Sequence, residues 1–206
     1  TKCKGTVWHR MNTYVYKLKD AYYINLTNAC TNNCTFCLRN EYSGVGEYDL
    51  TLSRDPEAAD IIAEFERIPD VKEAVFCGLG EPTMRLDVLL EVARYLKGRG
   101  VHVRLNTNGQ GSAFNGEDIA PKLRGLVDTV SISLNAPNAA RYDRLCQSVY
   151  GEEAYKHVLD FAKSCVAQGI ETILSVVDLI GEDEIEQCRR IAESLGGKLR
   201  IRRYIE

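Results

Sequence analysis

Hydrophobic, β-branched runs alternate with amphipathic stretches from residue 21 to the end of the chain. The hydrophobic runs have the length and composition of strands, and in the stretches between them apolar residues recur at helical spacing. The predicted strands are Ala21–Thr27, Glu73–Cys77, Val101–Asn106, Thr129–Leu134, Thr172–Val177 and Leu199–Tyr204. The predicted helices are Pro56–Ile68, Leu86–Lys97, Glu117–Leu123, Ala139–Leu145, Glu152–Gln168 and Glu184–Leu195. Asp55 is expected to cap the first helix, with Pro56 in its first turn.

Six strand–helix repeats predict an α/β fold with a parallel sheet, because strand–helix–strand crossovers are right-handed. Six strands are too few to close an eight-stranded barrel, so we expect a partial (β/α)6 TIM-type barrel with one open side. Active sites of such folds lie at the carboxyl ends of the strands. Side chains that directly follow a strand are therefore the candidates for chemistry.

Three cysteines follow the first predicted strand with the spacing C-x3-C-x2-C: Cys30, Cys34 and Cys37. Three thiolates can hold three irons of a [4Fe-4S] cluster and leave the fourth iron open to a substrate. An electron-transfer cluster needs a fourth protein ligand. A zinc site normally needs four Cys or His ligands, usually in two pairs, and no second pair follows here. The spacing favours a cluster with one open iron.

Polar runs also follow the second, third and fourth predicted strands: Gly78–Glu81, Arg104–Gly109 and Ser131–Asn135. Glycines let backbone carbonyls approach a cation closely, and a carboxylate accepts hydrogen bonds from it. Each run has a structural alternative, namely a Gly-rich turn, an Asn-Gly turn, or hydroxyls satisfied by neighbouring backbone. On the last two strands, Ser175, Asp178, Arg200, Arg202 and Arg203 could contact adenine or an anionic substrate group, or could be solvated at a sheet edge.

The cysteine run, with Phe36 just before Cys37, resembles the signature of the radical S-adenosylmethionine (radical SAM) superfamily. The resemblance implies that Cys30, Cys34 and Cys37 bind the cluster and that the amino and carboxylate groups of SAM chelate the open iron. Reduction of SAM then gives a 5′-deoxyadenosyl radical, which abstracts hydrogen from a substrate. The superfamily core has the same six-repeat architecture, so motif and predicted fold agree.

The polar runs resemble the SAM-binding motifs of that superfamily. Gly78, Gly80 and Glu81 match its Gly-Gly-Glu-Pro motif, although Leu79 replaces the first of the paired glycines. The SAM contacts that the resemblance implies are Phe36, Gly78, Gly80, Glu81, Asn106, Asn108 and Ser133. The residues that act on the substrate stay unassigned.

Within the superfamily, the segments Tyr23–Asn28, Cys34–Asn40, Arg104–Gly111 and Ser131–Pro137 are similar to the TatD-associated radical SAM proteins. The similarity covers roughly residues 11–206, the predicted core domain; residues 1–10 are expected to be a disordered leader or an expression remnant. The resemblance implies an external electron donor, such as flavodoxin or ferredoxin, and a functional link to a TatD-type hydrolase. It leaves open whether the substrate is a small molecule, a nucleotide or a peptide.

Composition narrows the classes of partner. The net charge is −3 and no basic block stands out, which argues against a broad nucleic-acid surface. No run approaches the roughly 18 apolar residues that span a membrane. An exposed iron–sulfur cluster needs a reducing compartment, so we expect the cytoplasm. The other cysteines after Met11 lack ligand spacing; Cys165 and Cys188 are expected to pack as buried hydrophobes, and packing is also favoured for Cys77 and Cys146 over a role as thiol donors.

Two alternatives stay open. One is an activase that installs a glycyl radical on a partner protein, and the other is a non-catalytic iron–sulfur electron carrier or sensor. A methyltransferase with a methyl-carrying cysteine shares the G-x-G-E-P variant, but it needs extra late cysteines that this chain lacks.

Overall fold

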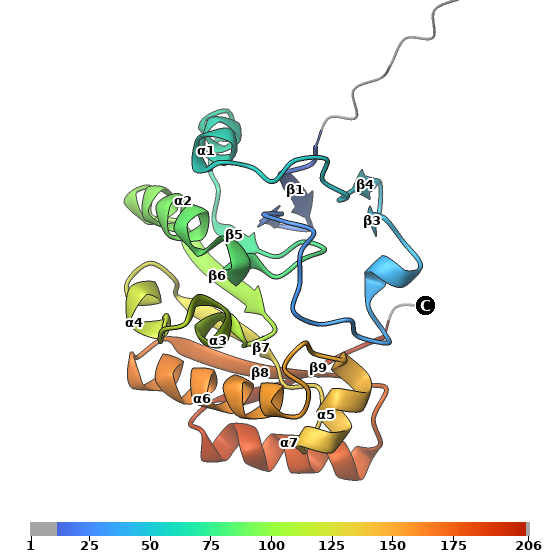
Figure 1. Cartoon of the computed structure of the whole chain (residues 1–206). Coiled ribbons are helices and arrows are strands. Elements are labelled where there is room, and N and C mark those ends of the chain that lie inside the picture. The colour runs from blue at the N-terminus through green and yellow to red at the C-terminus, as the bar shows by residue number, and fades with distance from the viewer. Residues whose placement is uncertain (1–11, 205–206) are drawn as a thin grey trace, which may run out of the picture.

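A seven-stranded sheet dominates the computed structural model, which describes residues 12–204. The strands are β1 (Val15–Leu18), β2 (Ala21–Ile24), β5 (Glu73–Phe76), β6 (His102–Thr107), β7 (Thr129–Ser133), β8 (Glu171–Val177) and β9 (Lys198–Arg202). They lie side by side in this order, and every neighbouring pair from β2 to β9 is parallel. These six strands are the six predicted from sequence. The α/β class is confirmed, and the open, curved sheet is consistent with a partial TIM-type barrel (Figure 1).

The helices lie along the outer side of the curved sheet (Figure 1). They are α1 (Ala58–Glu66), α2 (Leu86–Gly98), α3 (Gly111–Asn115), α4 (Ala120–Leu123), α5 (Ala139–Cys146), α6 (Glu153–Ala167) and α7 (Glu182–Ser194), with the 3-10 helices η1 (Leu38–Asn40) and η2 (Pro82–Arg85). Among residues 12–204, no helix is long and apolar enough to cross a membrane. The prediction for residues 1–10 falls outside the described part of the chain.

Three local predictions need correction. The first helix begins at Ala58, and a reciprocal capping box between Glu57 and Asp60, rather than Asp55, satisfies its first turn. The helix predicted over Glu117–Leu123 shrinks to α4, and the short α3 forms ahead of it. The strand β1, which pairs with β2 in an antiparallel hairpin, and the small hairpin of β3 (Gly44–Val45) and β4 (Tyr48–Asp49) were not predicted.

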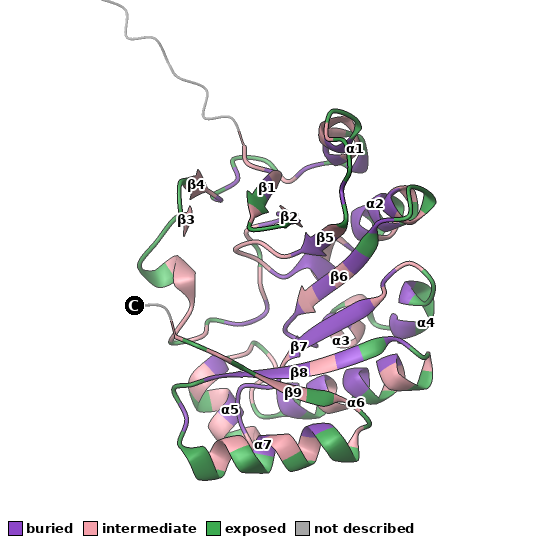
Figure 2. Ribbon diagram, turned by 180° about the vertical axis from the view of Figure 1, so that it is seen from behind, coloured by how far each residue is buried: buried purple, intermediate pink, exposed green. Residues whose placement is uncertain are grey.

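Alternation along the central strands separates the core from the site. Leu105, Val130, Ile132 and Leu174 are fully buried and belong to the hydrophobic core. The central strand β7 is buried over most of its length (Figure 2). On β6 and β7 the intervening positions are polar, and on β8 Ser175 follows Leu174. At equivalent levels of the sheet, Asn106 pairs with Ser131, and Ser133, Ser175 and Arg200 form one row across three strands. The period of two along a strand thus directs polar side chains away from the core.

Candidate functional site

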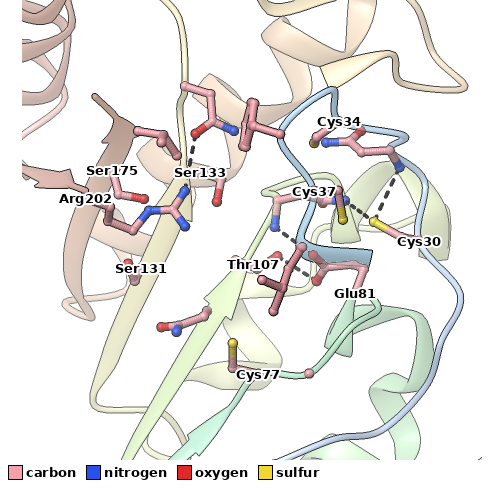
Figure 3. Close-up of a pocket in the computed structure, with 18 of the residues that line it drawn as sticks. Cys30, Cys34, Cys37, Cys77, Glu81, Thr107, Ser131, Ser133, Ser175 and Arg202 are labelled. Atoms are coloured by element: carbon pink, nitrogen blue, oxygen red, sulfur yellow. Dashed lines mark hydrogen bonds between the residues drawn. The ribbon is translucent and has the colours of Figure 1, made fainter. Parts of the chain in front are cut away.

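A cavity of about 340 Å³ opens at the carboxyl ends of the parallel strands. All ten residues predicted to bind the cluster or SAM line it, although they come from four separate segments of the chain: Cys30, Cys34, Phe36, Cys37, Gly78, Gly80, Glu81, Asn106, Asn108 and Ser133. The fold therefore brings the predicted groups together at one place (Figure 3).

The cysteine loop is docked on the carboxyl end of α5. The backbone N–H of Asn33 donates to the Cys146 carbonyl at 3.0 Å, and that of Thr35 donates to the Leu145 carbonyl at 2.9 Å. The Asn32 side chain donates to the Tyr142 hydroxyl at 3.2 Å. These contacts join residues more than 100 positions apart, and they fix the path of the loop between Cys30 and Cys37.

Arg39 fastens the same loop from its other end. Its Nε donates to the Cys37 sulfur at 3.3 Å, while Nη1 and Nη2 donate to the carbonyls of Asn28 (3.0 Å) and Asn32 (3.1 Å). One planar guanidinium thus joins the segment before Cys30, the loop interior and the Cys37 sulfur. Arg39 belongs to a segment that carried the resemblance, but sequence alone assigned it no role.

The other two sulfurs also have polar neighbours. The Cys30 sulfur accepts from the Asn32 N–H at 3.4 Å and lies 3.7 Å from the Asn108 amide nitrogen. Burial, with the nearby Glu81 carboxylate, raises the pKa of Cys30 to about 11. A hydrogen bond with Cys146, together with burial, also raises the pKa of Cys34. Without a metal these two thiols stay protonated at neutral pH, and coordination is the influence that deprotonates such a thiol.

This donor set fits a cluster. Among residues 12–204, no three or more His, Cys, Asp or Glu side chains are grouped to hold a single metal ion. A four-iron cube does not require such convergence, because each thiolate binds a different iron. Three thiols around one cavity, with N–H donors directed at Cys30 and Cys37, suit a group whose sulfur ligands carry negative charge.

Glu81 ties the end of β5 to the end of β6. Its Oε1 accepts from the Thr83 N–H (3.1 Å), the Thr83 hydroxyl (2.7 Å) and the Thr107 hydroxyl (2.7 Å), and Oε2 accepts from the Asn108 N–H (2.7 Å). Burial raises the pKa of this carboxyl, and the four donors oppose that effect by stabilising the carboxylate. Oε2 accepts one hydrogen bond and keeps a second acceptor position, and Glu81 lines the cavity. Most of the role of Glu81 in the free protein is therefore structural.

The two predicted glycines are required by close backbone approach. A Cβ on Gly80 would collide with the carbonyl oxygens of Thr27 and Ala29, and one on Gly78 would collide with the Asn25 side chain. The Glu81 N–H donates to the Ala29 carbonyl at 2.8 Å across the same contact. These glycines press the strand-end turn against the segment that leads into Cys30.

Asn108 and Asn106 have different environments. The Asn108 amide donates to the Thr31 hydroxyl at 2.8 Å and accepts from the Gln110 N–H at 2.9 Å, so its bonds are largely satisfied within the protein. The Asn106 Oδ1 is buried without a partner, and Asn106 hydrogen-bonds to the Cys77 sulfur. A buried acceptor without a donor is costly. Asn106 is therefore the stronger candidate for contact with a bound ligand.

The remaining predictions fall into two groups. Ser131, Ser133 and Ser175 line the cavity, and Ser175 also lies 3.4 Å from the Ile132 carbonyl. Cys165 and Cys188 are fully buried, as predicted. Cys146 is buried beside Cys34 and accepts from Asn135 at 3.4 Å, whereas Cys77 lines the cavity.

Sequence reasoning missed the network that supports the loop. Gln110 donates to Asn32 at 2.8 Å and to the Tyr142 hydroxyl at 2.9 Å, and it accepts from the Thr31 hydroxyl at 2.8 Å. Gln110 follows the predicted Asn-Gly turn, and that position was the available signal.

The comparisons with known proteins agree with this geometry. Residues 24–195 match the family model described as the radical SAM superfamily. The chain belongs to the radical SAM superfamily. Membership confirms the predicted superfamily and the prediction of a radical SAM enzyme, and it implies a [4Fe-4S] cluster and SAM as cofactors.

Two curated relatives of this radical SAM chain share part of its length. The tungsten-containing aldehyde ferredoxin oxidoreductase cofactor-modifying protein of Pyrococcus furiosus is 30% identical over 90 residues, which are 42% of this chain and 23% of that protein. A putative glycyl-radical enzyme activating enzyme of Methanocaldococcus jannaschii is 32% identical over 140 residues, 66% of this chain and 52% of that protein. The chain thus spans about half of the second relative and less of the first.

A solved radical SAM neighbour shares the fold over most of the chain. SuiB of Streptococcus suis, bound to its precursor peptide SuiA, superposes with a TM-score of 0.67 at 15% identity, covering 89% of this chain and 39% of SuiB. SuiB bound to S-adenosylmethionine gives a TM-score of 0.65. At this level of identity the likeness shows the fold alone.

Proposed function

We propose that this chain uses a [4Fe-4S] cluster to cleave SAM reductively and to start hydrogen abstraction from a substrate. The observation that carries the proposal is the single cavity, in which three thiols, a Gly-x-Gly-Glu turn and polar strand ends face one space. When bound, such a cluster supplies the electron that breaks a carbon–sulfur bond of SAM, giving methionine and a 5′-deoxyadenosyl radical.

The protein groups have distinct tasks in this proposal. Cys30, Cys34 and Cys37 hold the cluster, and the N–H donors on Cys30 and Cys37 stabilise the thiolates. The remaining acceptor position of Glu81 and the carbonyls of the Gly78–Gly80 turn receive the N–H donors of the SAM amino group. Asn106 Oδ1 and the Ser133 hydroxyl offer hydrogen bonds to the ribose, and Phe36 offers apolar surface beside the loop.

The test is anaerobic reconstitution, reduction, addition of SAM and measurement of 5′-deoxyadenosine by mass spectrometry. We expect cleavage by the wild-type chain and none by Cys34→Ala. Cys165→Ala removes a buried thiol that does not line the cavity, and it should retain cleavage. A chain with a full complement of iron and sulfide that does not cleave SAM would refute the proposal.

A glycyl-radical activase is the second candidate, because one curated relative carries that putative description. An activase would form about one 5′-deoxyadenosine per glycyl radical on a partner protein, with the radical visible by EPR. An electron carrier or sensor, in contrast, would show no change in the EPR signal of its reduced cluster when SAM is added. That spectrum separates the enzyme from the carrier.

The finer assignments belong to the same proposal. Membership of the TatD-associated group, and with it a link to a TatD-type hydrolase, is supported by the segments given above. An external donor such as flavodoxin or ferredoxin would supply the electron, and the cytoplasm would provide the reducing compartment.

A further inference from the structure

Arg202 brings an unpaired positive charge to the wall of the cavity. It belongs to β9, the last parallel strand, and its Cα is in register with Val177 of β8. Its guanidinium lies beside Ser175, on the side of the cavity away from Cys30 (Figure 3). The cavity is thus lined by sulfur ligands at one end and by a cation at the other.

The guanidinium is poorly satisfied by the protein. Its Nε is buried without a hydrogen-bond partner, and the one hydrogen bond found for its other nitrogens is a long one from Nη2 to Asn135 Oδ1, at 3.4 Å. No carboxylate pairs with Arg202 among residues 12–204. A guanidinium has five N–H donors, and burying it without an anion is costly. The side chain therefore has hydrogen-bond donors available for a negatively charged partner.

The neighbouring groups strengthen the positive character of this end. Arg200, also on β9, and Arg203 line the same cavity and have no ion pair within the described chain. The acidic residues that line the cavity are Glu41, which is exposed, and Glu81, whose carboxylate already accepts four hydrogen bonds. The acids of the cavity therefore leave Arg202 uncompensated.

SAM does not supply the missing anion under the proposed function. Its amino and carboxylate groups are expected to chelate the open iron beside the cysteine loop, and its sulfonium group is a cation. We propose, resting on that function, that Arg202, assisted by Ser175 and Arg200, binds a carboxylate or phosphate group of the substrate. The substrate class is then an organic acid or a phosphate ester, and neutral or cationic compounds are disfavoured. Arg202 presents the planar fork that matches either oxyanion.

The test measures anion binding directly. Cluster-loaded protein with SAM is titrated with inorganic phosphate and, separately, with succinate by isothermal calorimetry at constant ionic strength. We expect saturable binding of at least one of the two anions, a loss of at least tenfold in affinity in Arg202→Gln, and a smaller loss in Arg202→Lys. Arg190→Gln, which removes an exposed arginine of α7 that pairs with Glu186, should leave the affinity unchanged. Comparison of the two anions distinguishes a phosphate ester from an organic acid.

Two results would overturn the anion site. One is equal affinity of wild type and Arg202→Gln for both anions. The other is weaker SAM binding in Arg202→Gln, seen in the EPR of the reduced cluster, with anion affinity unchanged; the guanidinium would then serve SAM. Formation of 5′-deoxyadenosine is measured separately. Cleavage of SAM without anion binding would refute the anion site alone. Anion binding without cleavage of SAM would refute the proposed function alone.

Discussion

Glu81→Gln is expected to loosen the junction between β5 and β6. The Glu81 side chain is 4% exposed and accepts four hydrogen bonds, three at Oε1 and one at Oε2. Glutamine has almost the same shape but exchanges one acceptor oxygen for an NH2 group. The less damaging orientation keeps the amide oxygen on the Thr83 and Thr107 donors and turns the NH2 group toward the Asn108 N–H.

The cost follows from this geometry. The Asn108 N–H loses its partner in a buried position, which costs about 1–3 kcal/mol. The other three bonds lose their charge assistance, which roughly halves their strength and adds about 1–2 kcal/mol. Burial disfavours the Glu81 carboxylate and raises its pKa, so replacing the charged group by a neutral amide recovers part of the lost stability. The net expectation is a loss of about 2–4 kcal/mol in the free energy of unfolding.

Urea unfolding of the anaerobically purified protein, followed by far-UV circular dichroism at pH 7, measures this loss. A decrease of this size lowers the midpoint by roughly 1–2 M urea. Glu41→Gln is the matched control, because Glu41 is an exposed carboxylate at the rim of the same cavity. Its effect should stay within about 0.5 kcal/mol. A change that small in Glu81→Gln would contradict the assigned role of Glu81.

Three further predictions test other parts of the structure. Arg39→Met removes the N–H donor on the Cys37 sulfur. If this hydrogen bond stabilises the reduced cluster by about 0.5–1.5 kcal/mol more than the oxidised cluster, its loss lowers the cluster potential by roughly 20–65 mV. An EPR-monitored redox titration measures this shift, and an unchanged potential would refute the role of Arg39. Although burial acts in the opposite direction, hydrogen bonds from Lys97 and the Val103 N–H hold the pKa of Asp128 below its usual 3.8. The stability that Asp128 contributes is thus present above that pH and lost as pH falls through the lowered pKa. Asp128→Asn should therefore cost about 1 kcal/mol at pH 6 and progressively less below pH 4 in urea unfolding, and a pH-independent difference would contradict this. Gly80→Ala should lower the urea midpoint and the iron content together, because the added methyl group displaces the backbone before Cys30; retention of both would show that the turn can move.

Local pattern was sufficient for the parallel strands and for the position of the cysteine run. A strand of five to seven residues alternates between core and cavity, so its own residues carry the period, as in Thr129–Ser133. The order of the repeats then placed every strand-end motif at one edge of the sheet. The strand β1 was not predicted, because its four residues, of which one is buried, show little hydrophobic alternation. The capping pair Glu57 and Asp60 was not predicted, because Asp55 followed by Pro56 is an equally good local signal for the start of a helix.

The sequence by itself determined the motif residues that line the cavity, because the spacing of Cys30, Cys34 and Cys37 and the strand-end motifs are local properties. The tertiary structure alone decided how those residues are held. Arg39 donates to the Asn28 and Asn32 carbonyls, and Asn32 donates to Tyr142 across 110 positions. The Nε of Arg202 is buried in the cavity wall without a partner. Such contacts depend on how distant segments pack. The hydrogen-bond partners of a polar side chain and its burial are therefore decided only when the sheet is assembled.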